Sequence, residues 1–167
     1  MRKIIMNKVI ISVDPGASGS WAWQSLNGVV HVMNNGDTPR DILEQVRQMK
    51  DERDEDGSIL TPDRFVCYME DVGRGMPGQS SSATATFARH CGHLEMALMA
   101  EDIAIIKVLP TKWQKKLGIG KSTDYASKPA WKNAIKAKEQ ERHPTIKVTL
   151  KNADALGILD YALGVND

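Results

Sequence analysis

The stretch ISVDPGASGSWAW, residues 11–23, places a carboxylate between an apolar, strand-like run and a turn of small residues. The apolar residues before Asp14 are typical of a buried β-strand, and Pro15 and Gly16 then turn the chain sharply. Small residues beside a carboxylate leave room for a ligand to approach it, because glycine lets main chain and ligand come close. An isolated Asp-Pro-Gly sequence is also typical of a plain β-turn capped by the aspartate. The rest of the chain must decide between a simple turn and a binding site.

The composition is typical of one folded domain that covers residues 1–167. Hydrophobic residues make up 41% of the chain and charged residues 26%, so the chain is able to bury a sizeable core. No stretch approaches the roughly 20 apolar residues that cross a bilayer, and we expect no membrane partner. Cys67 and Cys91 lie in apolar segments, and no export signal is recognisable, which favours a cytoplasmic location over a disulfide framework.

The net charge of +1 conceals a strongly basic segment. Residues 1–106 carry 10 Lys and Arg against 15 Asp and Glu, whereas residues 107–151 carry 12 against 3. Aromatic side chains are interleaved with the lysines of this segment, as in many surfaces that bind nucleic acid. A solvated helix face that only keeps the protein soluble would have the same composition.

The pattern of apolar residues predicts an α/β domain. Residues 3–13 are expected to form a strand, and residues 20–34 two short strands around the Asn27-Gly28 turn, so that the first three strands form an antiparallel meander. Two further strands are predicted over residues 64–71 and 103–109. Helical spacing of apolar residues predicts helices over residues 39–54, 85–102, 111–118, 128–142 and 151–164.

Three carboxylates fall where this outline allows them to meet. Asp14 ends the first strand, Glu70 ends the fourth strand, and Asp154 lies in the first turn of the last helix. If the first and fourth strands are neighbours, two of the acids converge, and a helix packed on the sheet brings the third. Like charges repel strongly away from water, so a cluster of this kind normally binds a metal ion. Oxygen ligands without an accompanying His or Cys set favour Mg²⁺ or Mn²⁺ over zinc.

Five stretches, in their order along the chain, resemble motifs of the RuvC-type Holliday-junction endonucleases of the ribonuclease H-like superfamily, and of bacteriophage members in particular. They are IISVDPGASGSWAW (10–23), VCYMEDV (66–72), MPGQSSSATATFARHCGHLEMAL (76–98), VLPTKWQKKLGI (108–119) and NADALGILDYALG (152–164). The resemblance implies a ribonuclease H-like fold, with a five-stranded mixed sheet of the meander and parallel strands, flanked by helices. It also implies a Mg²⁺-dependent endodeoxyribonuclease that acts as a homodimer on four-way junctions, and on flaps or forks as further substrates.

The resemblance makes Asp14, Glu70 and Asp154 the ligands of two Mg²⁺ or Mn²⁺ ions. Cellular members of the family have an acid or a histidine three positions before the last aspartate, where this chain has Lys151. On a helix Lys151 would share a face with Asp154. There it would contact the scissile phosphate, stabilise charge in the transition state, or only pair with Asp154. Asp160 is a poor replacement ligand, because six residues correspond to about 240° around a helix.

DNA contacts are expected from the basic segment and from the loop after the fourth strand, with an affinity that falls steeply with salt. The candidate residues are Lys107, Lys112, Lys115, Lys116 and Lys121, with Arg74 and Gln79 near the branch point. Trp113 and Trp131 either stack on bases or belong to the core. The helix over about residues 82–100 is the expected dimer contact, unless it only packs on the sheet. Its candidate interface residues are Phe87, His90, Leu94 and Ala97.

Two other classes of function compete with the nuclease. A junction-binding protein with weak or no catalysis is compatible with the loss of a ligand at Lys151. An actin-like ATPase also begins with a strand-end aspartate followed by glycine, but it needs two such domains and about twice the length. The sequence leaves open which DNA branch type is preferred.

Overall fold

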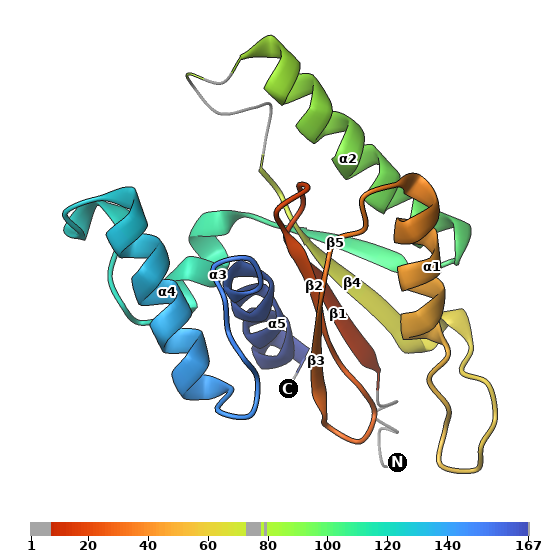
Figure 1. Cartoon of the computed structure of the whole chain (residues 1–167). Helices are drawn as coiled ribbons and strands as arrows, with labels where there is room; N and C mark the ends of the chain where they lie inside the picture. The colour runs from red at the N-terminus through yellow and green to blue at the C-terminus, as the bar shows by residue number, and fades with distance from the viewer. Residues whose placement is uncertain (1–7, 73–77, 79, 167) are drawn as a thin grey trace.

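A five-stranded mixed sheet forms the centre of the computed structural model, which describes residues 8–72, 78 and 80–166 (Figure 1). The strands are β1 (Val9–Val13), β2 (Ser20–Gln24), β3 (Val30–Asn34), β4 (Phe65–Glu70) and β5 (Ala104–Val108). Their order across the sheet is β3-β2-β1-β4-β5, with β1 antiparallel to β2 and parallel to β4. The predicted meander and the two parallel strands are confirmed. The first strand begins at Val9, and residues 3–7 of its predicted range lie outside the described residues.

Helices cover both faces of the sheet (Figure 1). They are α1 (Pro39–Lys50), α2 (Ser81–Ala100), α3 (Pro110–Lys116), α4 (Lys128–Arg142) and α5 (Ala153–Asn166). Helix α1 begins where Thr38 and Asp41 form a capping box, and Ser80 and Ser127 cap α2 and α4. Within the described residues, no helix combines the length and the apolar character that a membrane span requires.

The alternation of side chains along the central strands divides the core in two. Ile10 and Val66 point to the face that is covered by α3, α4 and α5, whereas Ile11 and Cys67 point to the face that is covered by α1 and α2. Every residue of β1 and β4 is buried, because both faces of these strands are covered. The carboxyl ends of two buried parallel strands therefore lie side by side at one edge of the sheet.

Both tryptophans of the basic segment belong to the core. Trp113 is fully buried, and Trp131 packs in the same cluster with its ring centroid 5.1 Å from that of Tyr125. Gly157 of α5 has no side chain because a Cβ there would lie 2.7 Å from the Trp113 ring. Neither indole face is therefore available to stack on a base, and the core interpretation holds.

Candidate metal centre

The fold brings Asp14, Glu70 and Asp154 together. In the parallel register of β1 and β4, Val13 is opposite Met69, so Asp14 and Glu70 follow at the ends of neighbouring strands. The hydroxyl of Ser12 donates to the carbonyl of Ala155 at 2.7 Å, which fixes the first turn of α5 to β1 beside the two acids. Two strands and one helix thus deliver the three carboxylates to one region, where their charges interact, but their oxygens do not all lie within 4.8 Å of one another.

The three carboxylates interact strongly with one another. Burial is the main reason why the pKa of Asp14 lies well above its ordinary value, and the charges of Asp154 and Glu70 raise it further. Burial also raises the pKa of Glu70, and the charge of Asp154 adds to this effect. Asp14 and Glu70 therefore hold a proton more readily than they would in water, and a bound cation would favour their charged forms.

Small residues let the turn after Asp14 fold tightly. The amide of Asn35 donates to the carbonyl oxygens of Asp14 and Gly16, at 2.8 Å each, and the Gly16 N–H donates to Nδ1 of His90 at 3.2 Å. Gly16 has a φ of +112°, and a Cβ on Gly19 would lie 2.0 Å from the Asp14 carbonyl oxygen. The turn itself therefore requires two of the small residues that follow Asp14.

A core tryptophan orients Glu70. Nε1 of Trp113 donates to Oε1 of Glu70 at 2.9 Å, and this hydrogen bond partly offsets the effect of burial on the pKa of Glu70. The indole of Trp113 packs against α5, so the carboxylate is held by a side chain that cannot move freely. No local pattern in the sequence indicates this contact, which joins residues 43 positions apart.

Asp154 forms an ion pair with Lys132, a residue of α4 that the sequence did not single out. The ammonium donates to Oδ2 of Asp154, whose side chain is 8% exposed, while Oδ1 is buried and has no hydrogen-bond partner among the described residues. Burial lowers the pKa of Lys132, but attraction by Asp154, Asp14 and Glu70 outweighs it, and the pKa is raised overall. The only hint in the sequence was a lysine beside the core residue Trp131.

Lys151 is exposed in the turn that leads into α5, whose assigned start is Ala153. Thr149 and Asn152 cap this turn reciprocally: Oδ1 of Asn152 accepts from the Thr149 N–H at 2.8 Å, and Oγ1 of Thr149 accepts from the Asn152 N–H at 3.4 Å. The Ala153 N–H donates to the Thr149 carbonyl at 3.1 Å, so helical hydrogen bonding already spans Lys151. That Lys151 shares a face with Asp154 stays a prediction.

Two clefts open on either side of Glu70. One, of about 420 Å³, lies toward α3 and α4, and Lys132 and Asp154 line it together with the polar side chains of Gln114 and Thr123. The other, of about 390 Å³, lies toward α2 and β5. Glu70, at the end of β4, lines both clefts, although its side chain is largely buried.

The lysines that were predicted to bind DNA are exposed. Lys112, Lys115 and Lys116 lie on α3, and Lys121 lies in the segment that follows it. Lys107 lies on the edge strand β5, lines the second cleft, and pairs with Glu95 of α2. The other two candidates, Arg74 and Gln79, lie outside the described residues.

Two of the predicted dimer contacts are inside the molecule. Leu94 and Ala97 are buried in the core between α2 and the sheet, so neither is available to a partner. The apolar stripe of α2 therefore packs on the protein's own sheet along this part of the helix. Phe87 and His90, nearer the start of α2, contact Gly16 in the turn after Asp14.

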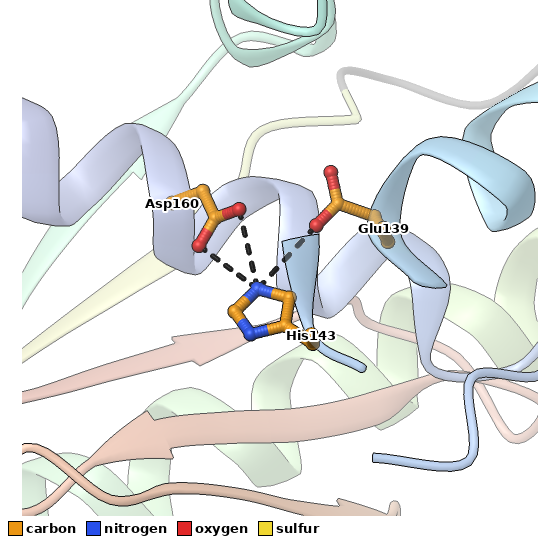
Figure 2. A group of neighbouring side chains, drawn as sticks. All are labelled: Glu139, His143 and Asp160. Carbon is orange, nitrogen blue, oxygen red and sulfur yellow. Dashed lines mark hydrogen bonds and ion pairs between the residues drawn. The ribbon is translucent and has the colours of Figure 1, made fainter. Parts of the chain in front are cut away.

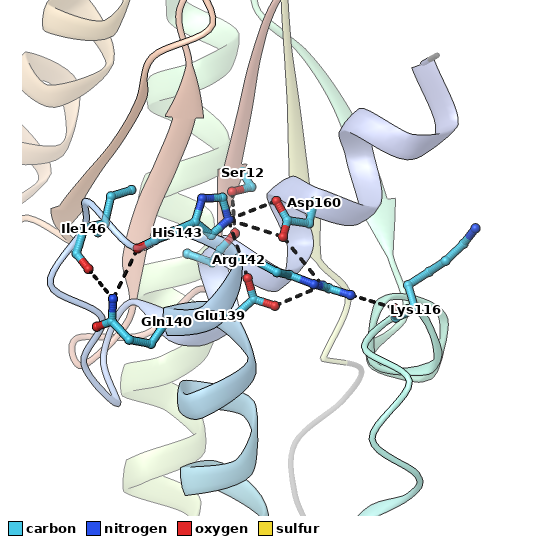
Figure 3. Close-up of polar contacts among 9 residues, drawn as sticks. Ser12, Lys116, Glu139, Gln140, Arg142, His143, Ile146 and Asp160 are labelled. Atoms are coloured by element: carbon cyan, nitrogen blue, oxygen red, sulfur yellow. Dashed lines mark hydrogen bonds and ion pairs between the residues drawn. The ribbon is translucent and has the colours of Figure 1, made fainter.

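A second titratable cluster joins α4 to α5 (Figure 2). Nε2 of His143 lies 3.1 and 3.2 Å from the two oxygens of Asp160 and 3.6 Å from Oε2 of Glu139. Nη1 of Arg142 lies 3.2 Å from Glu139 and 3.5 Å from Asp160, and its Nη2 donates to the carbonyl of Lys116 (Figure 3). Burial raises the pKa of Glu139 to about 8, and the hydrogen bond with Asp160 raises the pKa of His143.

The acids of this second cluster already have partners. Its ligand-type atoms lie within 4.8 Å of one another, but Arg142 and His143 face both acids, and the raised pKa of Glu139 favours its neutral form. The first cluster has three acids and one ammonium. Asp160 is thus paired within the second cluster, and the acids of the first cluster outnumber their one cation, which favours the first cluster as a site for a divalent cation.

Comparisons with known proteins find similarity in structure only. By sequence, the chain matches no protein-family model and no curated protein. It is similar to RuvC of Thermus thermophilus in complex with a Holliday junction substrate, with 9% identity, a TM-score of 0.55, and coverage of 95% of this chain and 96% of that one. A second Thermus thermophilus RuvC structure gives 11% identity, a TM-score of 0.56, and coverage of 94% and 96%. The chain has the ribonuclease H-like RuvC fold. The similarity does not support the bacteriophage origin that the sequence motifs suggested.

Proposed function

We propose that this protein is a metal-dependent, structure-selective endonuclease that cleaves phosphodiester bonds in Holliday junctions and other branched DNA. The observation that carries the proposal is the cluster of Asp14, Glu70 and Asp154 at one end of β1, β4 and α5. The RuvC-like fold supports the same reaction class, since one of the similar structures holds a Holliday junction. The acidic side chains of the cluster attract a divalent cation, and the exposed lysines attract DNA phosphates.

The residues present fit a hard divalent cation. Burial, together with the charges of Asp154 and Glu70, raises the pKa of Asp14, and the buried Oδ1 of Asp154 has no hydrogen-bond partner among the described residues. In our proposal Asp14, Glu70 and Asp154 hold Mg²⁺ or Mn²⁺, with two ions in each centre. When bound, such ions make water a better nucleophile and stabilise charge on the leaving oxygen.

In our proposal the surrounding residues orient the metal ligands and bind the substrate. Trp113 holds the Glu70 carboxylate, and Asn35 holds the turn that carries Asp14. In our proposal the exposed lysines of α3, together with Lys107, Lys121 and the exposed Lys151, bind DNA phosphates. Arg74 and Gln79 are proposed contacts near the branch point.

We extend the proposal to a homodimer. A four-way junction must be cut in two strands, and two centres related by a two-fold axis present the same geometry to both strands. Helix α2 remains the proposed contact, now through its exposed side rather than through Leu94 or Ala97. Met96 and Met99 on that side are each 64% exposed.

A cleavage assay with labelled DNA tests the nuclease. We expect the wild type to cut four-way junctions in Mg²⁺ or Mn²⁺ but not in EDTA, and to cut linear DNA poorly. D14N and D154N should each lower the cleavage rate by roughly 100-fold or more while junction binding persists. The control is D56N, which changes an exposed carboxylate in the loop before β4.

A junction-binding protein is the second candidate, because the Lys132 ammonium already occupies one oxygen of Asp154. In that case the wild type binds junctions but leaves them intact under all metal conditions. An ATPase would instead hydrolyse nucleotide without DNA. The same set of assays therefore separates the three functions.

A further inference from the structure

We propose that Lys132 is a resident counter-ion of the carboxylate cluster, and that a divalent metal ion must displace its ammonium in order to bind. The inference rests on the proposed function, since it takes Asp14, Glu70 and Asp154 as the metal ligands. It assigns to Lys132 the control of metal loading.

The ammonium of Lys132 lies where a cation of the centre belongs. Its Nζ donates to Oδ2 of Asp154, and its attraction extends to Asp14 and Glu70. The Lys132 side chain is 35% exposed, whereas that of Asp154 is 8% exposed, so the lysine is the more solvent-exposed partner of the pair. One ammonium is the partner of a cluster of three acidic side chains.

A divalent ion and the ammonium compete for the same oxygens. With the ammonium on Oδ2, only Oδ1 of Asp154 has no partner among the described residues. Two cations at hydrogen-bonding distance from one carboxylate also repel each other strongly where water is scarce. The long side chain of Lys132 has space to withdraw into, because it lines the cleft of about 420 Å³ beside the cluster.

The packing of α4 against α5 holds Lys132 near Asp154. Glu139 lies seven residues further along α4, which is two helical turns, and it belongs to the ionic cluster with His143 and Asp160. Helix α4 is thereby attached to α5 near both of its ends, through Lys132 with Asp154 and through the second cluster. The ammonium is thus brought to Asp154 by a helix that cannot slide along α5.

Titration calorimetry with Mn²⁺ in the absence of DNA tests this inference. K132M keeps most of the side-chain volume and removes the charge, and we expect it to bind Mn²⁺ at least about tenfold more tightly than the wild type does. K132R retains a cation and should bind Mn²⁺ as weakly as the wild type. K128M is the matched control, because Lys128 lines the same cleft but has no ion pair with the cluster among the described contacts.

Thermal unfolding gives a second readout. Without metal, K132M should unfold at a lower temperature than the wild type, because three carboxylates have lost their counter-ion. Mn²⁺ should raise the unfolding temperature of K132M by more than that of the wild type. If K132M does not fold without metal, K132Q replaces it in both measurements.

Equal or weaker Mn²⁺ affinity in the uncharged variant would overturn the role of Lys132. The proposed function is tested separately by D154N, which should lose Mn²⁺ binding. If D154N binds Mn²⁺ as the wild type does, the metal centre itself is misassigned. If D154N loses binding while K132M gains none, only the counter-ion role fails.

Discussion

At the scale of single residues, Trp113 links the core to the candidate metal centre. The sequence indicates the three acids because each stands at the end of a recognisable element, and the structure brings them together. The contacts of Trp113 with Glu70 and of Lys132 with Asp154 could not be predicted, since the partners lie 43 and 22 residues apart in the sequence. Contacts across such separations depend on how helices pack on the sheet, and no local pattern reports them.

Replacing Trp113 by phenylalanine should weaken metal binding. W113F keeps an aromatic ring in the core but removes the N–H that holds Glu70, and a residue that orients a ligand typically contributes about 10- to 100-fold in metal affinity. We expect a loss of about tenfold in Mn²⁺ affinity, measured by titration calorimetry. W131F, a matched change in the same core cluster, should leave the affinity unchanged. Unchanged affinity in W113F would mean that Glu70 needs no such support.

At the scale of elements, local cap residues predicted some helix starts and not others. Thr38 is a typical cap residue, and the structure confirms the predicted start of α1 at Pro39. Helix α2 begins at Ser81 after the cap Ser80, four residues before its predicted start at residue 85. The predicted start of the last helix at residue 151 falls within the turn that Thr149 and Asn152 cap, just before Ala153.

The second cluster between α4 and α5 should make stability depend on pH. Glu139 has an ordinary pKa of 4.5 that rises to about 8 in the folded protein, and the pKa of His143 is also raised. A raised folded pKa means that the folded state holds the proton more tightly, so this stability is fully present below the unfolded pKa and is lost as pH rises through the folded pKa. The unfolding temperature should therefore fall as pH rises from about 4.5 through about 8.

E139Q separates the contribution of Glu139 to the pH dependence of stability from that of Asp14 and Glu70. The raised pKa values of these two acids in the first cluster change stability in the same direction. The neutral amide cannot ionise, so the unfolding temperature of E139Q should fall less steeply than that of the wild type over the same pH range. Thermal denaturation without metal measures both curves. Parallel curves would show that Glu139 does not titrate in this range.

At the scale of the whole molecule, the order of the motifs was sufficient to predict the sheet, but not which surfaces stay free. An apolar stripe such as that of α2 is equally compatible with a core and with a dimer contact, and Leu94 and Ala97 proved to be core. Charge is more informative at this scale, because the lysines of α3 are exposed as the composition suggested. Their distribution leads to a prediction about DNA binding.

Junction affinity should depend steeply on salt, and lysines of the basic segment should set part of that dependence. If Lys115 and Lys121 each contact a phosphate, K115Q/K121Q should reduce the slope of log affinity against log salt by about 0.9 per lost contact. Fluorescence anisotropy with a four-way junction in EDTA measures the slope. R40Q, which removes an exposed charge from α1, should leave the slope unchanged. An unaltered slope in the double variant would place the DNA elsewhere.

The distance along the chain between Asp14 and Asp154 has a consequence during protein synthesis. A nascent chain that has emerged only as far as residue 150 already contains two of the three acids, but the helix that supplies the third has not yet been made. In the proposed nuclease, the third ligand therefore joins the other two only when α5 docks on β1. A nascent chain that lacks α5 is then unable to cut DNA.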